Sequence, residues 1–281
     1  MAFPVRGPGI QLLMKIKTPY RVKPHEPVRL SRVSTSQTGK YKSKQEADAD
    51  LEKHRLRMDA LQELLAAEGK HAVLVVLQGM DTAGKDGTIR HIFTGVNPQG
   101  CDVTPFKVPT PLEARHDFLW RAHNAVPAHG KIGIFNRSHY EDVLVTRVHK
   151  LISDREAETR MDEIVHFEEM LARNGIVILK FFLHISQAEQ TRRLKERLAD
   201  PSKHWKMSEA DFAERRFWPD YQKAYEDALS RTSCKHAPWF IVPADHKWYR
   251  NVVISAVIVE ALSGLNLKYP QPSFDFRKIK L

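Results

Sequence analysis

Five short runs of apolar residues, separated by longer amphipathic stretches, divide the chain. The run 72–78 reads AVLVVLQ, and the run 176–185 is the most apolar of the five. Neither alternates apolar and polar positions, which is typical of strands buried on both faces of a parallel sheet. The five predicted strands are 72–78, about 102–107, 131–135, 176–185 and 238–242.

The stretches between these runs have the spacing and the capping residues of helices. Ser43 and Glu46 form a capping box ahead of leucines at roughly helical spacing, and Gly69 closes this helix. The predicted helices cover 43–68, about 85–93, a segment that starts at Thr110-Pro111, about 138–149, 153–173, 186 to about 200, and 248–262.

Strand and helix alternate along the chain, and no internal repeat or long linker divides it. Parallel strands joined by helices form right-handed crossovers, so we expect an α/β fold of three αβα layers around a five-stranded parallel sheet. Prolines recur through the first residues and argue against a helix there. We therefore expect an extended N-terminal arm over 1–42 and a single domain over 43–281.

The composition narrows the possible classes of protein. The 281 residues include 44 Lys and Arg against 34 Asp and Glu, a formal net charge of +10. A hydrophobic content of 42% excludes general disorder, and two cysteines exclude a disulfide scaffold. The N-terminal residues do not resemble a secretory signal, so we expect a cytoplasmic protein. The charge alone is compatible with nucleic acid, an acidic membrane surface or a small polyanion as partner.

The turn after the first predicted strand reads Gly79-Met80-Asp81-Thr82-Ala83-Gly84-Lys85. It matches G-x-x-x-x-G-K between a buried strand and a helix, the context of a phosphate-binding loop. Backbone N–H groups, the helix N-terminus and the lysine charge then all face phosphate oxygens. The candidate phosphate-binding residues here are Gly79, Thr82, Ala83, Gly84, Lys85, Asp86, Gly87 and Thr88.

Two residues depart from most such loops. Asp86 follows the lysine where a Ser or Thr usually contacts Mg²⁺, and Asp81 places a carboxylate within the loop. A carboxylate repels bound phosphates unless a divalent cation lies between them, so Asp81 is a candidate Mg²⁺ ligand. An Asx turn that rigidifies the loop is the alternative. Thr88 either contacts a phosphate or packs on the helix.

A second candidate site follows the third predicted strand, in the segment FNRSHYED at 135–142. Asn136 lies where many phosphate-loop enzymes have a metal-binding Asp, and Glu141 or Asp142 is a candidate for the missing charge. Ser138 and Glu141 also match a capping box. Arg137 is a candidate for neutralising charge during phosphoryl transfer, with a surface ion pair as the alternative.

Three longer segments are more specific: GMDTAGKDGTIRH at 79–91, GVNPQGCDVTPFKVPTP at 95–111 and FNRSHYEDVLVTRVH at 135–149. They resemble polyphosphate kinase family 2, and the resemblance covers nearly the whole chain. It implies a fold similar to thymidylate kinase and a Mg²⁺-dependent transfer of the terminal phosphoryl group of inorganic polyphosphate to a nucleotide. The Asn-Arg-Ser-His-Tyr-Glu-Asp sequence resembles the third subclass, which accepts both AMP and ADP.

The resemblance also implies roles for individual residues. Asp81 and Glu141 are implied as metal ligands, and Lys85 as a phosphate clamp. The implied catalytic residues are Asp81, Lys85, Asn136, Arg137, Glu141 and Arg193. Arg137 and Arg193 also bind phosphate, and His139 either binds phosphate or orients Arg137.

Nucleotide kinases with a phosphate loop place a mobile lid after the fourth strand, so we expect a lid at about 201–220. Its candidates for closing over phosphates are Lys203, Lys206, Arg215 and Arg216, and its candidates for facing a base are Trp205, Phe217 and Trp218. The alternative is an ordinary amphipathic helix whose aromatic residues pack inward. Mn²⁺ is expected as an alternative ion, and guanine nucleotides as a second acceptor class beside adenine nucleotides. We expect no nucleic-acid or membrane partner, and a homo-oligomer, either a dimer or a tetramer.

Basic residues at predicted strand ends are expected to line a groove for polyphosphate: Lys85, Arg90, Lys107, Arg115, Arg121, Arg137, Arg147 and Arg193. Two other functions compete with this hypothesis. One is an ATP-dependent kinase of a nucleoside or small metabolite, and the other is a nucleic-acid-binding protein that uses the basic surface.

Overall fold

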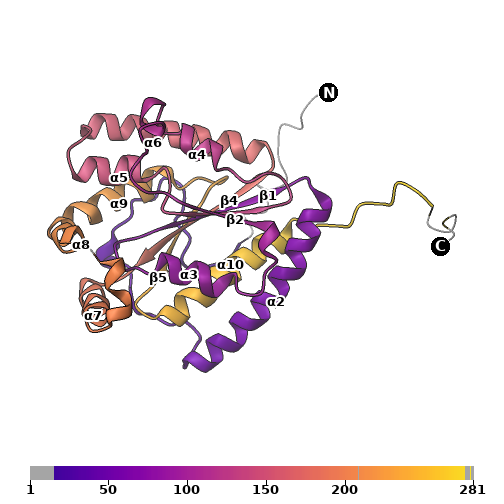
Figure 1. Ribbon diagram of the computed structural model, residues 1–281, viewed down its shortest axis with the longest axis horizontal. Helices are drawn as coiled ribbons and strands as arrows, with labels where there is room; N and C mark the ends of the chain where they lie inside the picture. The colour runs from indigo at the N-terminus through magenta and orange to yellow at the C-terminus, as the bar shows by residue number, and fades with distance from the viewer. Residues whose placement is uncertain (1–15, 208, 276–278, 280–281) are drawn as a thin grey trace.

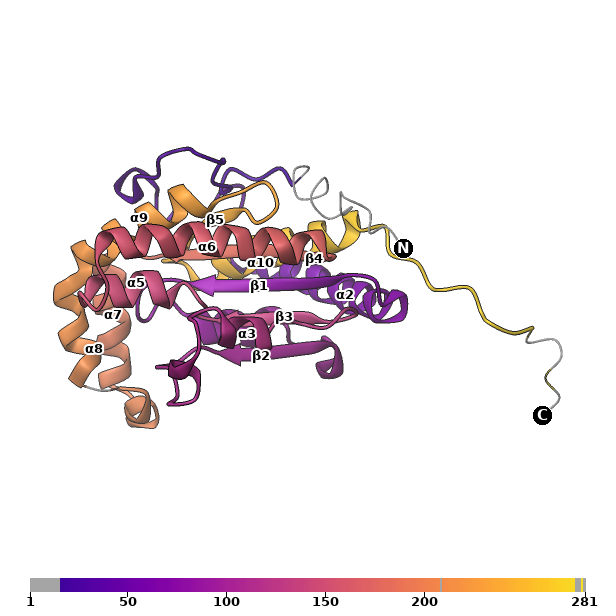
Figure 2. The same cartoon turned by 90° about the horizontal axis from the view of Figure 1, so that it is seen from above.

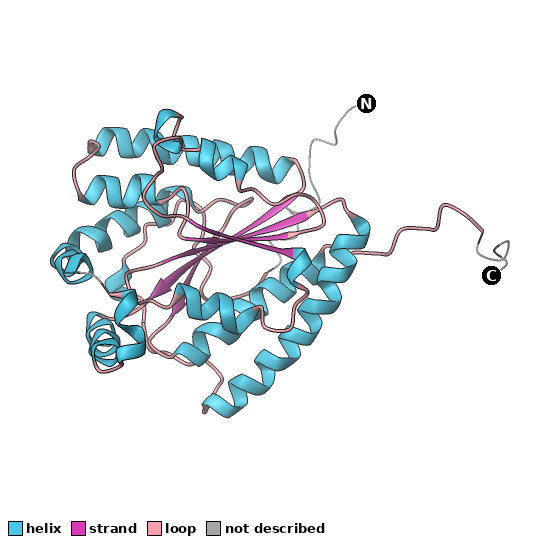
Figure 3. Cartoon of the chain, in the orientation of Figure 1, coloured by secondary structure: helices cyan, strands magenta, loops and turns pink. Residues whose placement is uncertain are grey.

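The computed structural model describes residues 16–207, 209–275 and 279. Its centre is a five-stranded sheet of β1 (Ala72–Gln78), β2 (Cys101–Pro105), β3 (Ile132–Asn136), β4 (Ile176–His184) and β5 (Trp239–Pro243). The strand order is β2-β3-β1-β4-β5, and all neighbouring strands run parallel. The carboxyl ends of the strands therefore meet at one edge of the sheet (Figure 3).

Burial follows the apolar runs. Every residue of β1 and of β4 is buried, because these two strands lie at the centre of the sheet with helices on both faces. β2, in contrast, forms an outer edge, and most of its residues are exposed or half-buried. The apolar runs without alternating polar positions thus correctly predicted the central strands.

Helices cover both faces of the sheet (Figure 1). The helices α2 (Lys44–Glu68), α3 (Lys85–Ile92) and α10 (Lys247–Gly264) pack together on one face. On the other face lie α5 (Glu141–Val148), α6 (Asp154–Arg173) and α9 (Trp218–Thr232), with the short α4 (Trp120–Asn124) near α6. The predicted three-layer α/β fold is confirmed.

The segment after β4 lies beyond the carboxyl ends of the strands (Figure 2). It contains α7 (Gln187–Leu198), η4 (Pro201–Lys206), α8 (Glu209–Glu214) and η5 (Arg215–Phe217), where η denotes a 3₁₀ helix. Arg215 bonds Gln190 Oε1 at 3.1 Å and Thr191 Oγ1 at 2.6 Å. His149 Nε2, directly after α5, lies 3.0 Å from Glu214 Oε1 of α8. The first contacts hold η5 against α7 within the segment, and the last one connects the segment to the end of α5.

Residues 16–42 lie along β5 and the neighbouring helices. The Ile241 amide donates to Tyr20 O at 2.8 Å, and the Val22 amide donates to Trp239 O at 2.9 Å, around an antiparallel bridge between Arg21 and Phe240. A single 3₁₀ turn, η1 (Leu30–Arg32), interrupts this segment. The contacts cover the outer edge of β5, which would otherwise expose unpaired backbone groups.

Two helices differ from the sequence-based expectation. The Thr110 amide donates to Glu113 Oε2 at 2.7 Å and Thr110 Oγ1 accepts from the Glu113 amide, as in a capping box. Only the 3₁₀ turn η3 (Glu113–Arg115) follows, because no buried apolar face lies behind it. The 15-residue α9 was not predicted, although Pro219 in its first turn and the buried Tyr225 and Leu229 are signals for it.

A last 3₁₀ turn, η2 (Pro98–Gly100), precedes β2. Within the described ranges, none of the helices is long and apolar enough to span a membrane.

Candidate active site

A cleft of about 720 Å³ opens at the carboxyl edge of the sheet. Its walls come from the loop after β1, the end of β3, α7, η4 and the first turn of α10. Parallel α/β sheets bind ligands at this edge, where the strand order reverses direction, here between β1 and β4. The cleft therefore joins the phosphate loop to the segment that bears the second motif.

The loop backbone turns its amides toward the cleft. Thr82 and Gly84 adopt φ values of 65° and 97°, and a 3.0 Å bond from the Ala83 amide to Met80 O closes the turn. The amides of Thr82, Gly84, Lys85 and Asp86 have no acceptor among the described residues. Thr82 Oγ1 is buried and also lacks a partner there. Such converging donors form a binding site for an anion.

Lys85 is the first residue of α3, and its side chain is buried beneath the loop. Its Nζ donates to Gly79 O at 2.8 Å. Burial lowers the pKa of Lys85, and the nearby Arg137 charge lowers it further. A phosphate in the cleft would reverse both effects, because it supplies the negative charge that the buried ammonium lacks.

Arg137 lies directly after β3 in the left-handed region, with φ of 61°. Its amide bonds Leu77 O at 3.0 Å, which fixes the turn to β1, and its guanidinium lies 3.3 Å from Asp81 Oδ1. Burial alone lowers the pKa of Arg137, but the carboxylates of Glu141 and Asp81 outweigh it, so the pKa is raised. The arginine therefore contacts one predicted metal ligand, Asp81, and interacts electrostatically with the other, Glu141.

Glu141 begins α5 and is half-buried. Burial raises its pKa, although Arg137 and Lys85 partly offset this effect. The capping box suggested by the sequence is not formed, since Ser138 Oγ instead accepts hydrogen bonds from the Tyr140 amide and from Gln78 Nε2, both at 3.1 Å. The carboxylate is thus not used as a cap.

The neighbouring acid has a different environment. Asp142 is buried in an ion pair with Arg121 at 2.8 Å, and Arg121 also bonds Lys107 O at 2.8 Å. Of the two acids considered as replacements for the missing charge at Asn136, Glu141 is the one that interacts with the lysine and arginine of the cleft.

The amide of Asn136 also has a clear partner. Its Nδ2 donates to Asp86 Oδ1 at 2.7 Å, so the carboxylate that is usual at the strand end lies instead in the loop, paired with an amide at position 136. A carboxylate at position 136 would face Asp86 across the same short distance. Asn136 therefore balances the charge that Asp86 brings to the loop.

The carboxylates fit a divalent ion that also binds substrate. Among the described residues no three His, Cys, Asp or Glu side chains form a preformed metal site. Mg²⁺ in phosphoryl-transfer enzymes is typically held by one or two carboxylates, phosphate oxygens and water. Asp81 and Glu141, which both interact with Arg137 and Lys85, form a donor set of this kind.

Three sequence-based expectations need correction or refinement. Thr88 is buried and its hydroxyl donates to Gly84 O at 3.0 Å, so it packs on its own helix. His139 is also buried and lies outside the cleft, with Nε2 facing Glu168 Oε1 at 3.4 Å. Arg193 reaches the cleft, but its guanidinium bonds backbone carbonyls.

The predicted basic groove is only partly correct. Lys85, Lys107, Arg137 and Arg193 line the cleft. The other four residues do not line it: Arg90, Arg115, Arg121 and Arg147. Arg147, for instance, is paired with Asp154 and Asp227 at 2.7 Å each.

Sequence reasoning missed three further basic residues of the cleft, namely Arg197, Lys247 and Arg250. Arg197 follows Arg193 by one helical turn, and Lys247 and Arg250 are three residues apart at the start of α10. These helical spacings were the available signal, because they place each pair on one helix face.

These features define a P-loop phosphotransferase: a phosphate loop on a parallel sheet, an arginine in the turn at the next strand end, and a helical segment over the cleft. The chain belongs to the polyphosphate kinase 2 family, whose model matches residues 41–270.

Known relatives agree with this assignment. An AMP/ADP-polyphosphate phosphotransferase of Meiothermus ruber is 51% identical over 92% of this chain and 98% of its own length. An ADP-polyphosphate phosphotransferase of Rhodopseudomonas palustris is 44% identical over 94% of this chain and 96% of its own. The crystal structure of polyphosphate kinase 2 from Arthrobacter aurescens TC1 matches with a TM-score of 0.88 and 42% identity, over 99% and 96% of the two chains.

Proposed function

We propose that this protein transfers the terminal phosphoryl group of inorganic polyphosphate to AMP and to ADP, with Mg²⁺ bound by Asp81 and Glu141. The main support is the convergence of Lys85, Arg137 and these two carboxylates on loop amides without acceptors. The relatives from Meiothermus ruber and Rhodopseudomonas palustris, whose names specify AMP/ADP and ADP, support the choice of acceptors.

The proposed phosphoryl transfer requires that donor and acceptor be aligned and that their negative charge be neutralised. A nucleotide phosphate is already ionised near neutral pH, so no residue needs to remove a proton from it. Lys85 and the loop amides hold the terminal phosphoryl group of the donor, and Arg137 neutralises charge between donor and acceptor. Asp81 and Glu141 would hold the ion, which would offset the negative charge of the phosphates.

The proposal also includes the remaining expectations from the sequence, on alternative ions and acceptors, location, assembly and domain roles. Mn²⁺ substitutes for Mg²⁺ at an all-oxygen site, and guanine nucleotides are a second acceptor class. The protein is cytoplasmic and forms a dimer or tetramer, without nucleic acid or membrane as partner. Residues 1–42 act as an arm on a kinase domain over 43–281, and 201–220 act as the lid, although residues 1–15 and the side chain of Lys206 lie outside the described part of the chain.

A coupled assay tests the activity. The protein is incubated with Mg²⁺, long-chain polyphosphate and either AMP or ADP, and ATP is followed with luciferase while ADP is followed by chromatography. We expect nucleotide phosphorylation that EDTA abolishes, and a loss of about a thousandfold or more in Lys85→Ala. No product from either acceptor, together with ATP consumption in the presence of a nucleoside, would instead support the ATP-dependent kinase.

A further inference from the structure

Arg193 of α7 donates all five of its N–H groups within the protein. Nε bonds Glu189 Oε1 at 2.6 Å, and one terminal nitrogen bonds the carbonyls of Thr82 and Ala83 at 3.0 Å each. The other terminal nitrogen bonds the carbonyls of Ala244 at 2.5 Å and Asp245 at 3.1 Å. A guanidinium has five donors in a fixed plane, so none remains for a substrate phosphate.

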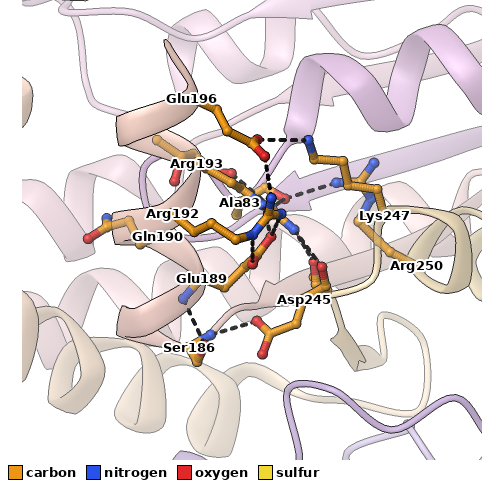
Figure 4. Close-up of polar contacts among 12 residues, drawn as sticks. Ala83, Ser186, Glu189, Gln190, Arg192, Arg193, Glu196, Asp245, Lys247 and Arg250 are labelled. Carbon is orange, nitrogen blue, oxygen red and sulfur yellow. Dashed lines mark hydrogen bonds and ion pairs between the residues drawn. The ribbon is translucent and has the colours of Figure 1, made fainter. Parts of the chain in front are cut away.

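The geometry connects two separate loops (Figure 4). Arg193 lies between Ala83 and Asp245, and it joins the phosphate loop to the segment between β5 and α10. Because the carbonyl of Ala83 points toward this guanidinium, the Gly84 amide that follows it is free to point into the cleft, while the Ala83 amide that follows the Thr82 carbonyl closes the turn onto Met80 O. The side chain thereby acts on substrate through the orientation of the loop.

Arg250 of α10 supports the same carbonyl from a second direction. Its guanidinium donates to Ala83 O at 3.0 Å and to Asn251 Oδ1 at 2.8 and 3.1 Å. The side chain is buried, and a Cβ at Gly84 would overlap it, which explains a glycine there beyond its φ of 97°. Arg250 forms no ion pair within the described ranges, and burial, with the Arg193 charge, lowers its pKa to about 9.

Arg197, one turn further along α7, contrasts with Arg193. It lines the cleft and is half-buried, and among the described residues its guanidinium has no hydrogen-bond or ion-pair partner. Two other basic residues on this side of the cleft have acidic partners, Lys203 with Asp200 at 2.6 Å and Lys247 with Glu196 at 3.9 Å. The donors of Arg197 are thus available to a ligand.

We propose that Arg193 and Arg250 are positioning residues that hold the carbonyls of the phosphate loop, and that Arg197 is the arginine of α7 that contacts the phosphate chain of the substrate. This division of roles rests on the proposed function, because it specifies which groups of that site touch polyphosphate. It changes the role that the family resemblance implied for Arg193.

Conservative variants of the contacting arginine give the first test. Arg197→Gln is expected to raise the KM for polyphosphate about tenfold or more, because a charge-assisted contact is lost. Arg197→Lys should recover most of that loss, since a point charge still attracts a phosphate. Arg192→Gln, on the same helix but outside the cleft, is the matched control. An unchanged KM in Arg197→Gln would overturn the assignment.

The positioning arginines are tested by backbone exchange. Hydrogen exchange of the peptide that spans the phosphate loop is measured without substrate in Arg193→Lys and in Arg250→Lys. An ammonium cannot replace the several fixed hydrogen bonds of either guanidinium, so both variants should show faster exchange at the loop, lowered kcat and a KM for polyphosphate within about threefold of wild type. Arg197→Gln should leave loop exchange unchanged. Wild-type exchange and kcat in Arg193→Lys would refute the positioning role.

A binding measurement separates this proposal from the proposed function. Calorimetric titration with tripolyphosphate requires no turnover, and Arg197→Gln should weaken binding about tenfold while Arg192→Gln should not. If wild type binds tripolyphosphate in this pattern but phosphorylates no nucleotide, the reaction is wrong and the division of roles stands. If Arg197→Gln binds as tightly as wild type, the division itself is wrong.

Discussion

Two ion pairs of the molecule involve or contact the motif at 135–142 but have opposite environments. Arg137 and Asp81 meet in the cleft at 3.3 Å, with side chains 42% and 36% exposed. Lys180 of β4 and Glu168 of α6 meet in the core at 2.5 Å, with side chains 0% and 1% exposed. The first pair has a single long contact, whereas the second belongs to a network.

The core pair is saturated with hydrogen bonds. Lys180 Nζ also donates to Tyr140 Oη and to Thr232 O at 2.8 Å each, and Tyr140 Oη donates to Glu168 Oε1 at 3.0 Å. Glu168 is further faced by His139. Buried charges are stable only with such complete pairing, which leaves nothing over for a ligand.

The motif FNRSHYED therefore divides into two parts with different purposes. His139 and Tyr140 attach its middle to the buried network. On either side of them, Arg137 lines the cleft, and Glu141 interacts electrostatically with Arg137 and Lys85. Weakly paired charges in the cleft remain available to phosphates and a metal ion. The fully hydrogen-bonded pair of Lys180 and Glu168 in the core fixes the position of the motif that bears them. The comparison indicates that the charged residues of this motif with few hydrogen-bond partners are those available for binding and chemistry.

The largest effect is expected in the cleft pair. Arg137→Ala should lower kcat between about a thousandfold and a hundred-thousandfold, as is typical of arginines that stabilise phosphoryl transfer. The free energy of unfolding should change by about 1 kcal/mol or less, because the pair is exposed and long. Steady-state kinetics with polyphosphate and ADP, combined with urea unfolding, measures both quantities. A large stability loss would show that the cleft pair resembles the core pair after all.

The second effect concerns the core pair. Lys180→Met should destabilise the protein by about 3–5 kcal/mol, since it leaves the buried Glu168 carboxylate without its cation. Adding Glu168→Leu should recover much of this loss in urea unfolding, because no unpaired charge remains. If the double variant is stable but has a much lower kcat, the network positions the motif. Equal stability of Lys180→Met and wild type would contradict the comparison.

The sequence predicted the sheet well, for a physical reason. The apolar runs of β1 and β4 need burial on both faces, and only a central position in a parallel sheet satisfies this requirement. The phosphate loop was equally clear, because its function depends on backbone geometry that few residue types permit. α9 was not predicted, since its first residues were assigned to the lid.

Side-chain partners were much harder to predict. The sequence shows that Arg193 is an arginine near the cleft, but the carbonyls that its terminal nitrogens bond belong to residues more than 50 positions away in the chain. Lys180 in the middle of an apolar strand was a signal for a buried anion, yet nothing local identifies Glu168 as that anion. His139 was assigned to the cleft because its neighbours are there, although alternate residues of a turn face opposite sides.

A smaller effect is expected from the amide that balances Asp86. Asn136→Asp places two carboxylates in contact and should destabilise the protein by about 1–2 kcal/mol in EDTA. Mg²⁺ should reduce this difference, because a divalent cation between the carboxylates removes their repulsion. Thermal unfolding with and without Mg²⁺ measures the effect. Asp86→Asn together with Asn136→Asp, which restores one charge and one amide, is the control and should resemble wild type in EDTA.

The smallest effect is a pH dependence of stability that originates from Glu141. Burial raises its pKa above the ordinary value of 4.5, against the opposing influence of Arg137, Lys85 and the Gln78 hydrogen bond, while Asp81 raises it further. The folded state therefore binds this proton more tightly than the unfolded state. Its contribution to stability is present below pH 4.5 and is lost as the pH rises through the folded pKa.

Glu141→Gln removes this titration. The variant should match wild type near pH 4.5 and become more stable at neutral pH by about 1 kcal/mol, roughly 2 °C in melting temperature, while its kcat falls. Melting curves from pH 4.5 to 8 test the expectation, with the exposed Glu163→Gln as the matched control. A difference that shrinks as the pH rises would mean that Arg137 and Lys85 outweigh burial. Glu141 would then be as fully paired as Glu168, and the contrast between cleft and core would not extend to this proposed metal ligand.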